Sequence, residues 1–297
     1  MKVSISEIKE YQTCPMSWYL KYIIKKQKRN RSELALNVGS YGHYRLEEFF
    51  SGDSMGSSIK ALMEVQQGNE QWLDELDKVD YTLEWFLAQP FVIKKILEVE
   101  GEGEVNVGMH QVPTKTDLVG LDADGKLWHV QWKFLSERTD LPGFCGMQER
   151  AMHECTYRKH LTAKYPQYEY MGTKLVVFLK RGIHKTAKGE ECGCKNPNGS
   201  PRKGVIHRDP SLNVFTEDLL VDEAKQAKAE RNISHWVNEM DMMQERDIRY
   251  VPQAETSCLG KFGACQFNAY CNGEADMGNE LFWETVNPYG HYKGGTV

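Results

Sequence analysis

The chain has no apolar run of the roughly 18 to 20 residues that a helix needs to cross a bilayer. Its first residues lack the apolar core and small-residue cleavage site of a secretory signal. Internal repeats and low-complexity tracts are absent too. These absences exclude a membrane-spanning protein and a repeat architecture, and we expect a cytoplasmic protein without a membrane partner.

Positive charge is also in short supply, because 37 Lys and Arg residues face 42 Asp and Glu residues and leave a net charge of −5. Nucleic acid therefore cannot be held by bulk charge and needs a local basic patch. One basic stretch places six basic residues between Lys21 and Arg31, whereas residues 64–104 carry eleven acids against three bases. This polarity permits a polyanionic partner, although such a charge run is also typical of a solvated surface.

The composition is that of a globular protein, with 40% hydrophobic and 27% charged residues in 297. This length fits two average domains or one elaborated α/β domain. Eight cysteines could indicate a disulfide scaffold, but a chain of this size can bury a core without one. In a reducing compartment, clustered thiols more often bind metal.

The periodicity of apolar residues predicts a helical N-terminal third followed by an α/β unit. The expected helices are two short ones within residues 4–25 that meet at Cys14-Pro15, then 39–50, 57–67, 69–98, 142–164 and 216–246. The expected strands are 104–108, 116–120, 127–134 and 173–180. Residues 182–212 are predicted to form a polar surface excursion, and the final twenty residues show no clear element.

Four segments follow from this pattern. Residues 1–100 form an N-terminal helical region, and residues 101–181 form the α/β core. Residues 182–215 are a surface loop, and residues 216–297 carry a long helix and a cysteine-bearing end that packs with the core as one module.

The most informative stretch pairs Asp117 with the sequence Val130-Gln-Trp-Lys133. If both lie in strands of one hairpin, Asp117 lies beside Gln131 and Lys133, which share a face of their strand. Carboxylate and amide oxygens can hold a hard divalent cation, and a neighbouring lysine can orient water or neutralise charge on a phosphate. The alternative is the solvated polar face of an edge hairpin.

Two helices could add polar groups to this stretch. His43 follows Gly39 by four residues at a helix start, and Glu47 lies one turn later on the same face. His153, Tyr157 and Leu161 form a stripe on the helix after the lysine strand. A single histidine on a helix is more often structural, and such a stripe more often belongs to a core.

Together these residues resemble the RecB-type branch of the PD-(D/E)XK nucleases, which includes single-strand exonucleases of CRISPR adaptation and the AddB nuclease domain. The family pattern is Gly-x3-His on a helix, Gly-x-x-Asp, acid-x-Lys on a strand, and Gln-x3-Tyr on the next helix. His43, Asp117, Lys133 and Tyr157 match it in order. The resemblance implies an α/β fold with a mixed central sheet flanked by helices, an N-terminal helical region and a C-terminal cysteine-rich segment.

The sequence departs from the family at two positions. Gln131 stands where the family has Asp or Glu, and His153 stands where it has Gln. Because an amide oxygen is neutral, Gln131 weakens the ligand set. The carbonyl of Trp132 or a nearby acid could complete the set, and among Glu100, Glu102 and Glu104 we favour Glu100.

Four cysteines form a separate pattern. Cys14 precedes the nuclease motifs, and Cys258, Cys265 and Cys271 follow them. Four thiolates suit either a tetrahedral zinc ion or a cubane iron–sulfur cluster. The layout of one plus three resembles the iron–sulfur branch of the same family and implies a four-iron, four-sulfur (4Fe-4S) cluster, with zinc as the alternative and free buried thiols as the plainest reading.

The resemblance implies an Mg²⁺- or Mn²⁺-dependent deoxyribonuclease, expected to be a single-strand exonuclease that acts alone or in a recombination or repair complex. Catalysis is assigned to His43, Asp117, Gln131 and Lys133, and the metal ligands are His43, Asp117, Gln131, the Trp132 carbonyl and Glu100. DNA contacts are expected from His153, Tyr157, Lys25, Lys26 and Arg29. The alternative is an inactive, nuclease-derived DNA-binding module that is stapled by a metal cluster.

Overall fold

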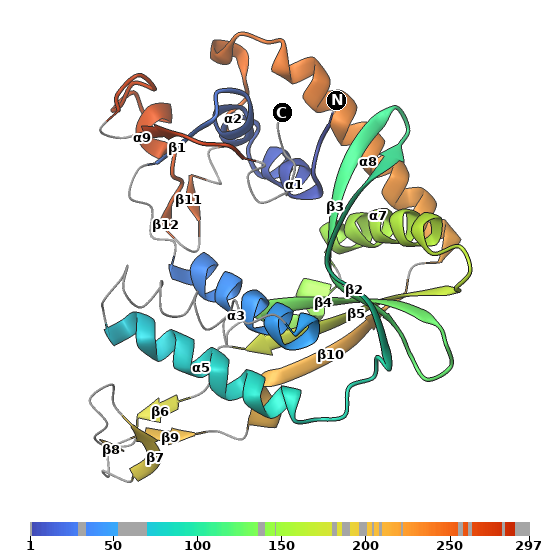
Figure 1. Cartoon of the computed structure of the whole chain (residues 1–297). Coiled ribbons are helices and arrows are strands. Elements are labelled where there is room, and N and C mark those ends of the chain that lie inside the picture. The colour runs from blue at the N-terminus through green and yellow to red at the C-terminus, as the bar shows by residue number, and fades with distance from the viewer. Residues whose placement is uncertain are drawn as a thin grey trace.

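The structure is a computed structural model of the whole chain (Figure 1). It describes residues 2–28, 34–52, 70–135, 140–145, 147–179, 183–185, 191–195, 201–203, 205–207, 210–220, 222–254, 258–260, 263–280 and 283–288. The predicted helix at 57–67 and the predicted DNA contact Arg29 lie outside these residues.

A five-stranded mixed sheet forms the centre of the fold, in the order β10-β5-β4-β3-β2. Only the β4–β5 pair is parallel, and its neighbours on both sides run antiparallel. The predicted mixed α/β core is therefore confirmed. The strands are β2 (Lys95–Val107), β3 (His110–Leu121), β4 (Leu127–Leu135), β5 (Tyr170–Leu179) and β10 (Val214–Leu219).

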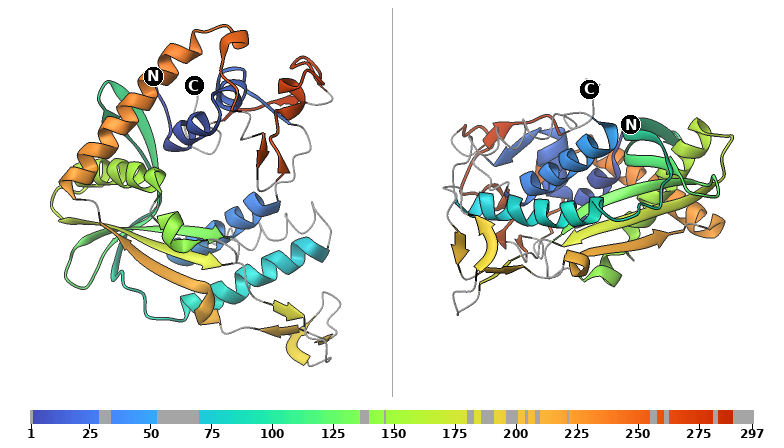
Figure 2. Two further views of the ribbon diagram at one scale, coloured as in Figure 1. Left: turned by 180° about the vertical axis from the view of Figure 1, so that it is seen from behind. Right: turned by 60° about the horizontal axis from the view of Figure 1, so that its bottom comes forward.

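Helices cover both faces of the sheet (Figure 2). α3 (Leu34–Ser51) and α5 (Glu70–Leu87) lie on one face. α7 (Gln148–Lys164) lies on the other, with α8 (Glu223–Gln244) outside it. Because parallel strands need a crossover, α7 and the short α6 (Leu141–Cys145) connect β4 to β5.

The alternation of side chains along β4 explains why both faces of the sheet are covered. Trp132 and Val130 pack into the core under α3 and α5, where the Trp132 ring stacks on Phe50 at 5.8 Å. His129 and Gln131 point the other way, toward Tyr157 of α7. The strand therefore buries an apolar face against two helices and a polar face against one.

The N-terminal and C-terminal segments share a second core with α8. α1 (Ile5–Thr13) begins at a capping box of Ser4 and Glu7, and α2 (Pro15–Trp18) and a π-helical turn (Tyr19–Ile23) follow. Trp18 and Trp283 are buried in this core, and β1 (Lys26–Lys28) pairs with β13 (Trp283–Thr285). The two predicted helices that meet at Cys14-Pro15 are confirmed.

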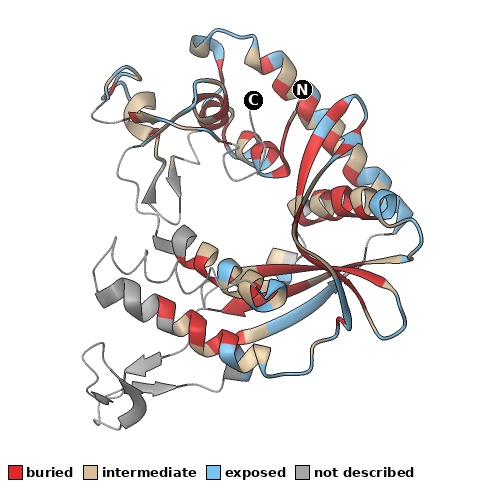
Figure 3. Ribbon diagram, viewed as in Figure 1, coloured by how far each residue is buried: buried red, intermediate tan, exposed pale blue. Residues whose placement is uncertain are grey.

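The remaining elements are short. They are β6 (Ile183–Lys185), β7 (Glu191–Lys195), β8 (Pro201–Lys203), β9 (Val205–His207), β11 (Leu259–Gly260), β12 (Gly263–Ala264), α9 (Asn268–Cys271) and two 3₁₀ turns (Pro210–Asn213 and Ile248–Tyr250). Figure 3 shows that β10 is the exposed edge of the sheet, whereas β4 and β5 are buried. No helix in the described part of the chain is long and apolar enough to cross a membrane.

Several predicted boundaries are wrong, among them that of the strand predicted at 104–108, which is β2 (Lys95–Val107). The helix predicted at 69–98 ends at Leu87, because Pro90 disfavours helix in the residue before it, and β2 already begins at Lys95. The helix predicted at 216–246 begins at Glu223, since residues 214–219 form edge strand β10. The final twenty residues contain β13, whose pairing with β1 is too distant in sequence to be seen from local pattern.

Candidate functional site

A pocket of about 230 Å³ lies between β3, β4, α7 and the start of α1. It is lined mainly by polar and charged side chains, which include two lysines, one arginine and several groups that can bind a cation or a phosphate. Those that carry the argument below are Lys115, Asp117, Gln131, Lys133, Arg150, His153 and Tyr157.

His43 reaches the rim of this pocket from α3 because its helix approaches β4 closely. A Cβ atom at Gly42 would lie 2.2 Å from the Phe134 ring, so only glycine permits this approach. The His43 ring meets the Phe134 ring edge-on at 5.8 Å. His43 is thereby held by packing, and its Nδ1 lies 3.5 Å from Oδ1 of Asp117.

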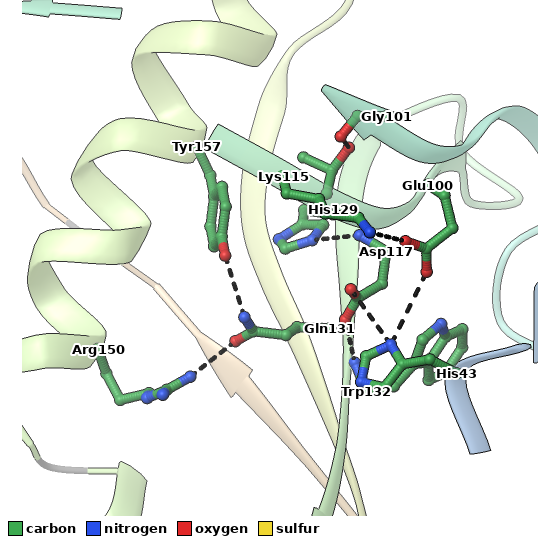
Figure 4. A network of polar contacts seen from close by, with 11 residues as sticks. His43, Glu100, Gly101, Lys115, Asp117, His129, Gln131, Trp132, Arg150 and Tyr157 are labelled. Carbon is green, nitrogen blue, oxygen red and sulfur yellow. Dashed lines mark hydrogen bonds and ion pairs between the residues drawn. The ribbon is translucent and has the colours of Figure 1, made fainter. Parts of the chain in front are cut away.

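Asp117 is the central carboxylate of the site (Figure 4). Its Oδ2 accepts a hydrogen bond from the backbone N–H of Trp132 at 2.8 Å, and Oδ1 faces His43. The pairing of Leu118 with Val130 places Asp117 opposite Gln131, as the hairpin prediction requires. The side chain of Asp117 is 11% exposed, so its charge lies at the edge of the protein interior.

Glu100 on β2 lies opposite Asp117 on the other side, between the pairs Val99–Leu118 and Gly101–Thr116. Its φ of 51° lies in the left-handed region, which is strained for a residue with a Cβ and is often associated with functional sites. One carboxylate oxygen lies 3.8 Å from Nδ1 of His43, and the other binds Lys115 at 2.9 Å. Burial opposes ionisation, but the contacts with His43 and Lys115 outweigh it and lower the pKa of Glu100.

The three side chains fit a divalent cation. His43, Glu100 and Asp117 each offer one ligand atom, and these atoms all lie within 4.8 Å of one another. Both carboxylates are largely buried and offer oxygen donors, which hard cations such as Mg²⁺ and Mn²⁺ prefer. Among the residues that the structure describes, no other group of His, Cys, Asp and Glu side chains meets this distance.

Lys133 shares the pocket with Asp117. Burial lowers the pKa of Lys133, the carboxylate of Asp117 opposes this effect, and the charge of Arg150 adds to it. A lysine with these neighbours can place an N–H donor beside a phosphate or a water molecule.

Gln131 is held from the opposite side by α7. Its amide oxygen accepts a hydrogen bond from Nη1 of Arg150 at 3.0 Å, and its amide nitrogen donates to the Tyr157 hydroxyl at 3.0 Å. Figure 4 shows Arg150 and Tyr157 approaching Gln131 from the side away from His43. Both polar atoms of the Gln131 side chain are thus engaged by α7, and its role as a metal ligand stays a prediction.

Comparison with known proteins identifies the fold. A sequence profile of the PD-(D/E)XK nuclease superfamily matches residues 2–272. The chain belongs to this superfamily. A candidate exonuclease from Eubacterium rectale has a similar fold, with a TM-score of 0.52 and 12% sequence identity over 92% of this chain and 88% of that chain.

A second solved structure, SSO0001, aligns over 91% of this chain and 96% of that chain, with 15% sequence identity and a TM-score of 0.30. A search of curated proteins finds no match. The superfamily assignment therefore rests on the sequence profile, and the likeness to the solved exonuclease structure supports the fold alone.

In this PD-(D/E)XK protein, the remaining predicted site residues fall into two places. His153 and Tyr157 line the same pocket, where the Tyr157 hydroxyl lies 3.5 Å from Nδ1 of His153. Lys25, which is exposed, precedes β1, and the half-buried Lys26 begins it, and both lie outside the pocket lining. Their role in DNA binding stays a prediction.

Sequence reasoning missed Lys115, Glu149 and Arg150. Lys115 precedes Asp117 by two residues on β3 and so shares its face, a spacing that the sequence does display. Arg150 and Glu149 lie at the start of α7, whose packing brings both to the pocket and Arg150 to Gln131. Burial opposes ionisation of Glu149, but contacts with His153 and Lys9 and the charge of Arg150 lower its pKa to about 2.

The four predicted cluster cysteines are reduced and lie near one another. Cys14 caps α2, with its sulfur accepting from the Ser17 N–H, and the backbone N–H of Cys265 bonds to the carbonyl of Cys258. Burial and then the charges of Cys258, Cys14 and Cys265 raise the pKa of Cys271 to about 11. The structure therefore brings the distant Cys14 to the three C-terminal cysteines.

Proposed function

We propose that this protein is a divalent-metal-dependent deoxyribonuclease that hydrolyses phosphodiester bonds in single-stranded DNA, as an exonuclease. The observation that carries the proposal is one group of His43, Glu100 and Asp117 beside Lys133 in a pocket of a PD-(D/E)XK nuclease. A bound Mg²⁺ or Mn²⁺ ion would supply Lewis-acid stabilisation of charge on a phosphate oxygen.

Each residue of the group has its own task. Asp117 and Glu100 supply negative charge and oxygen ligands, and His43 supplies a nitrogen ligand from α3. Lys115 fixes Glu100 through their 2.9 Å contact. Lys133 positions the attacking water and places positive charge beside the phosphate.

The size and boundaries of the pocket support action on a single strand. Its volume is about 230 Å³, and Ile5 and Ser6 in the first turn of α1 line one side of it. A space of this size suits one strand better than two. A side bordered by α1 also suits a strand end, which favours exonuclease action.

We further propose that Cys14, Cys258, Cys265 and Cys271 hold a structural 4Fe-4S cluster. Cys14, Cys265 and Cys271 pack in one cluster, and a backbone hydrogen bond joins Cys265 to Cys258. Four gathered thiolates suit either a zinc ion or a cubane cluster. We favour iron because the layout of one cysteine before the nuclease motifs and three after them resembles the iron–sulfur branch of the family.

The proposal is tested with protein purified under anaerobic conditions. End-labelled single-stranded and duplex DNA are incubated with Mg²⁺, Mn²⁺ or EDTA, and iron, sulfide and zinc are measured on the same sample. We expect Mg²⁺- or Mn²⁺-dependent release of short products from the single strand. The iron–sulfur cluster should give a brown colour and absorption at about 400 nm. Binding of DNA without cleavage would instead support an inactive DNA-binding module.

A further inference from the structure

The side-chain amide oxygen of Gln131 already accepts a hydrogen bond from Arg150. Arginine offers only donors, so the amide oxygen must face Arg150 and the amide nitrogen must face Tyr157. The usual ambiguity in the orientation of a glutamine side chain is therefore removed. The Gln131 oxygen, which could bind a metal ion beside Asp117, is therefore bonded to the guanidinium of Arg150.

Both oxygens of Asp117 already have a polar partner. Its Oδ1 faces His43 at 3.5 Å, and its Oδ2 accepts from the backbone N–H of Trp132 at 2.8 Å. Two-metal sites hold their ions about 3.5 to 4 Å apart between shared oxygen ligands. On the Gln131 side of Asp117, the described pocket lining offers one further carboxylate, that of Glu149, which is paired with Lys9 and Arg150.

Arg150 is instead a buried cation with an unused donor. Arg150 is 7% exposed. Its guanidinium lies over the Phe144 ring at 4.8 Å, and its Nη2 lies 3.5 Å from a carboxylate oxygen of Glu149. Nε of Arg150 is buried and has no hydrogen-bond partner among the described residues. Because an unsatisfied buried donor is costly, a guanidinium that lines a pocket in this state is suited to an anion.

The electrostatics of the pocket are divided in the same way. His43, Glu100 and Asp117 form a cation site of which Asp117 lines the pocket, whereas the basic residues Lys133 and Arg150 line it elsewhere, beside Glu149. Burial lowers the pKa of Lys133, and the charge of Arg150 acts in the same direction. A divalent ion beside Gln131 would meet the same repulsion.

We propose that the guanidinium of Arg150 takes the place of a second metal ion, so that the site holds one divalent cation at His43, Glu100 and Asp117. Arg150 contacts a phosphate oxygen of the DNA strand from the Gln131 side of the pocket. Gln131 is then a positioning residue that holds the guanidinium fork in place. This inference rests on the proposed nuclease function and names how the site completes its positive charge.

The direct test counts bound ions on the full-length protein. Mn²⁺ is titrated into the anaerobically purified chain together with a phosphorothioate single strand that resists cleavage, and free Mn²⁺ is measured by electron paramagnetic resonance. The inference expects one Mn²⁺ per chain. Two bound ions in active protein would overturn it, and no bound ion would overturn both the inference and the proposed metal site.

Substitutions at Arg150 supply an independent readout. Arg150→Met is expected to keep one bound Mn²⁺ and to lower kcat about 100-fold, the usual cost of losing one charged transition-state donor. Arg150→Lys keeps the charge and should retain kcat within about 10-fold of the original, since a lysine replaces the charge but not the fork. Arg158→Met, two turns along α7, is the matched control and should keep full activity.

A purely structural role for Arg150 gives a different pattern. Arg150→Lys and Arg150→Met would then lose activity only in proportion to the fraction of unfolded protein, which circular dichroism measures, and this result would contradict the inference. The double variant Gln131→Glu with Arg150→Met restores an acid and removes the guanidinium. It is expected to bind a second Mn²⁺, and a count that stays at one would contradict the claim that Arg150 excludes that ion.

Discussion

Two groups of candidate ligand side chains in this protein are assembled by different means. The ligand atoms of His43, Glu100 and Asp117 (the sheet group) lie within 4.8 Å of one another because strand register and the close approach of α3 place them there. Cys14, Cys258, Cys265 and Cys271 (the cysteine group) are instead brought together by the packing of the two chain ends around α8. The sheet group thus depends largely on strand register, whereas the cysteine group depends on contacts between the two ends of the chain.

The largest expected effect concerns the sheet group and its lysine. Lys133→Ala should lower kcat by about 1,000-fold with little change in melting temperature, because it removes a buried positive charge beside the reacting phosphate. Rates on end-labelled single-stranded DNA in Mn²⁺ measure this. The exposed Lys95→Ala on β2 is the control. Full activity of Lys133→Ala would remove the catalytic assignment of the pocket.

The buried acid Glu154 predicts how the stability of the fold depends on pH. Glu154 on α7 is 2% exposed, and burial raises its pKa from an ordinary 4.5 to about 8. The folded protein therefore holds a proton that the unfolded chain releases, so stability falls as the pH rises from about 4.5 to about 8. The shift corresponds to a loss on the order of 4 kcal/mol at pH 8.

Glu154→Gln removes this titration. Urea unfolding at pH 5 and pH 8 should show a smaller difference in the free energy of unfolding for Glu154→Gln than for the original protein. An unchanged difference would show that Glu154 ionises in the folded state and would contradict the burial argument.

The contribution of Glu100 sharpens the comparison further. Glu100→Gln should weaken Mn²⁺ binding about 100-fold, because a neutral oxygen replaces an ionised ligand. Isothermal titration calorimetry measures the affinity. Glu104→Gln, on the same strand but paired with Lys2 at the surface, should leave it unchanged. Equal affinities in both variants would remove Glu100 from the ligand set.

Changes in the cysteine group should affect the stability of the fold rather than the rate of DNA cleavage. Cys14→Ser is expected to lose most of its bound iron and roughly 2 to 4 kcal/mol of unfolding free energy, because a cluster that joins residue 14 to residue 271 closes almost the whole chain. Iron analysis and chemical denaturation measure both quantities. Cys155→Ala, whose thiol lies outside the predicted cluster, should keep its iron. Retention of iron by Cys14→Ser would contradict the assignment.

The smallest effect is expected from the basic residues of the chain-end core. Lys25→Ala with Lys26→Ala should weaken binding to single-stranded DNA about 3- to 10-fold at low salt and lower the salt dependence of the affinity by about one or two units. Fluorescence anisotropy across a salt series measures both. An unchanged slope would mean that these lysines do not contact phosphates.

Much of the site on β3 and β4 could be predicted from sequence because it depends on local periodicity. The spacing of Gln131 and Lys133 defines one strand face, and a single hairpin brings Asp117 to them. Glu100 was one of three acids in an alternating run, and only the register of β2 with β3 distinguishes it from its neighbours.

The opposite side of the pocket could not be predicted in the same way. Arg150 and Glu149 reach the pocket, and Arg150 reaches Gln131, only because α7 packs back over the sheet, and no short-range pattern encodes that contact. The proximity of Cys14 to Cys271 could be expected only from a family resemblance, because it depends on packing between the two ends of the chain.

The most direct test of the account is a crystal structure of the protein with Mn²⁺, in which anomalous scattering locates the ion. The account predicts one strong anomalous peak in contact with Nδ1 of His43 and carboxylate oxygens of Glu100 and Asp117, with Arg150 still bonded to Gln131. A peak coordinated by Gln131, or crystals saturated with Mn²⁺ that show no peak between His43, Glu100 and Asp117, would contradict it.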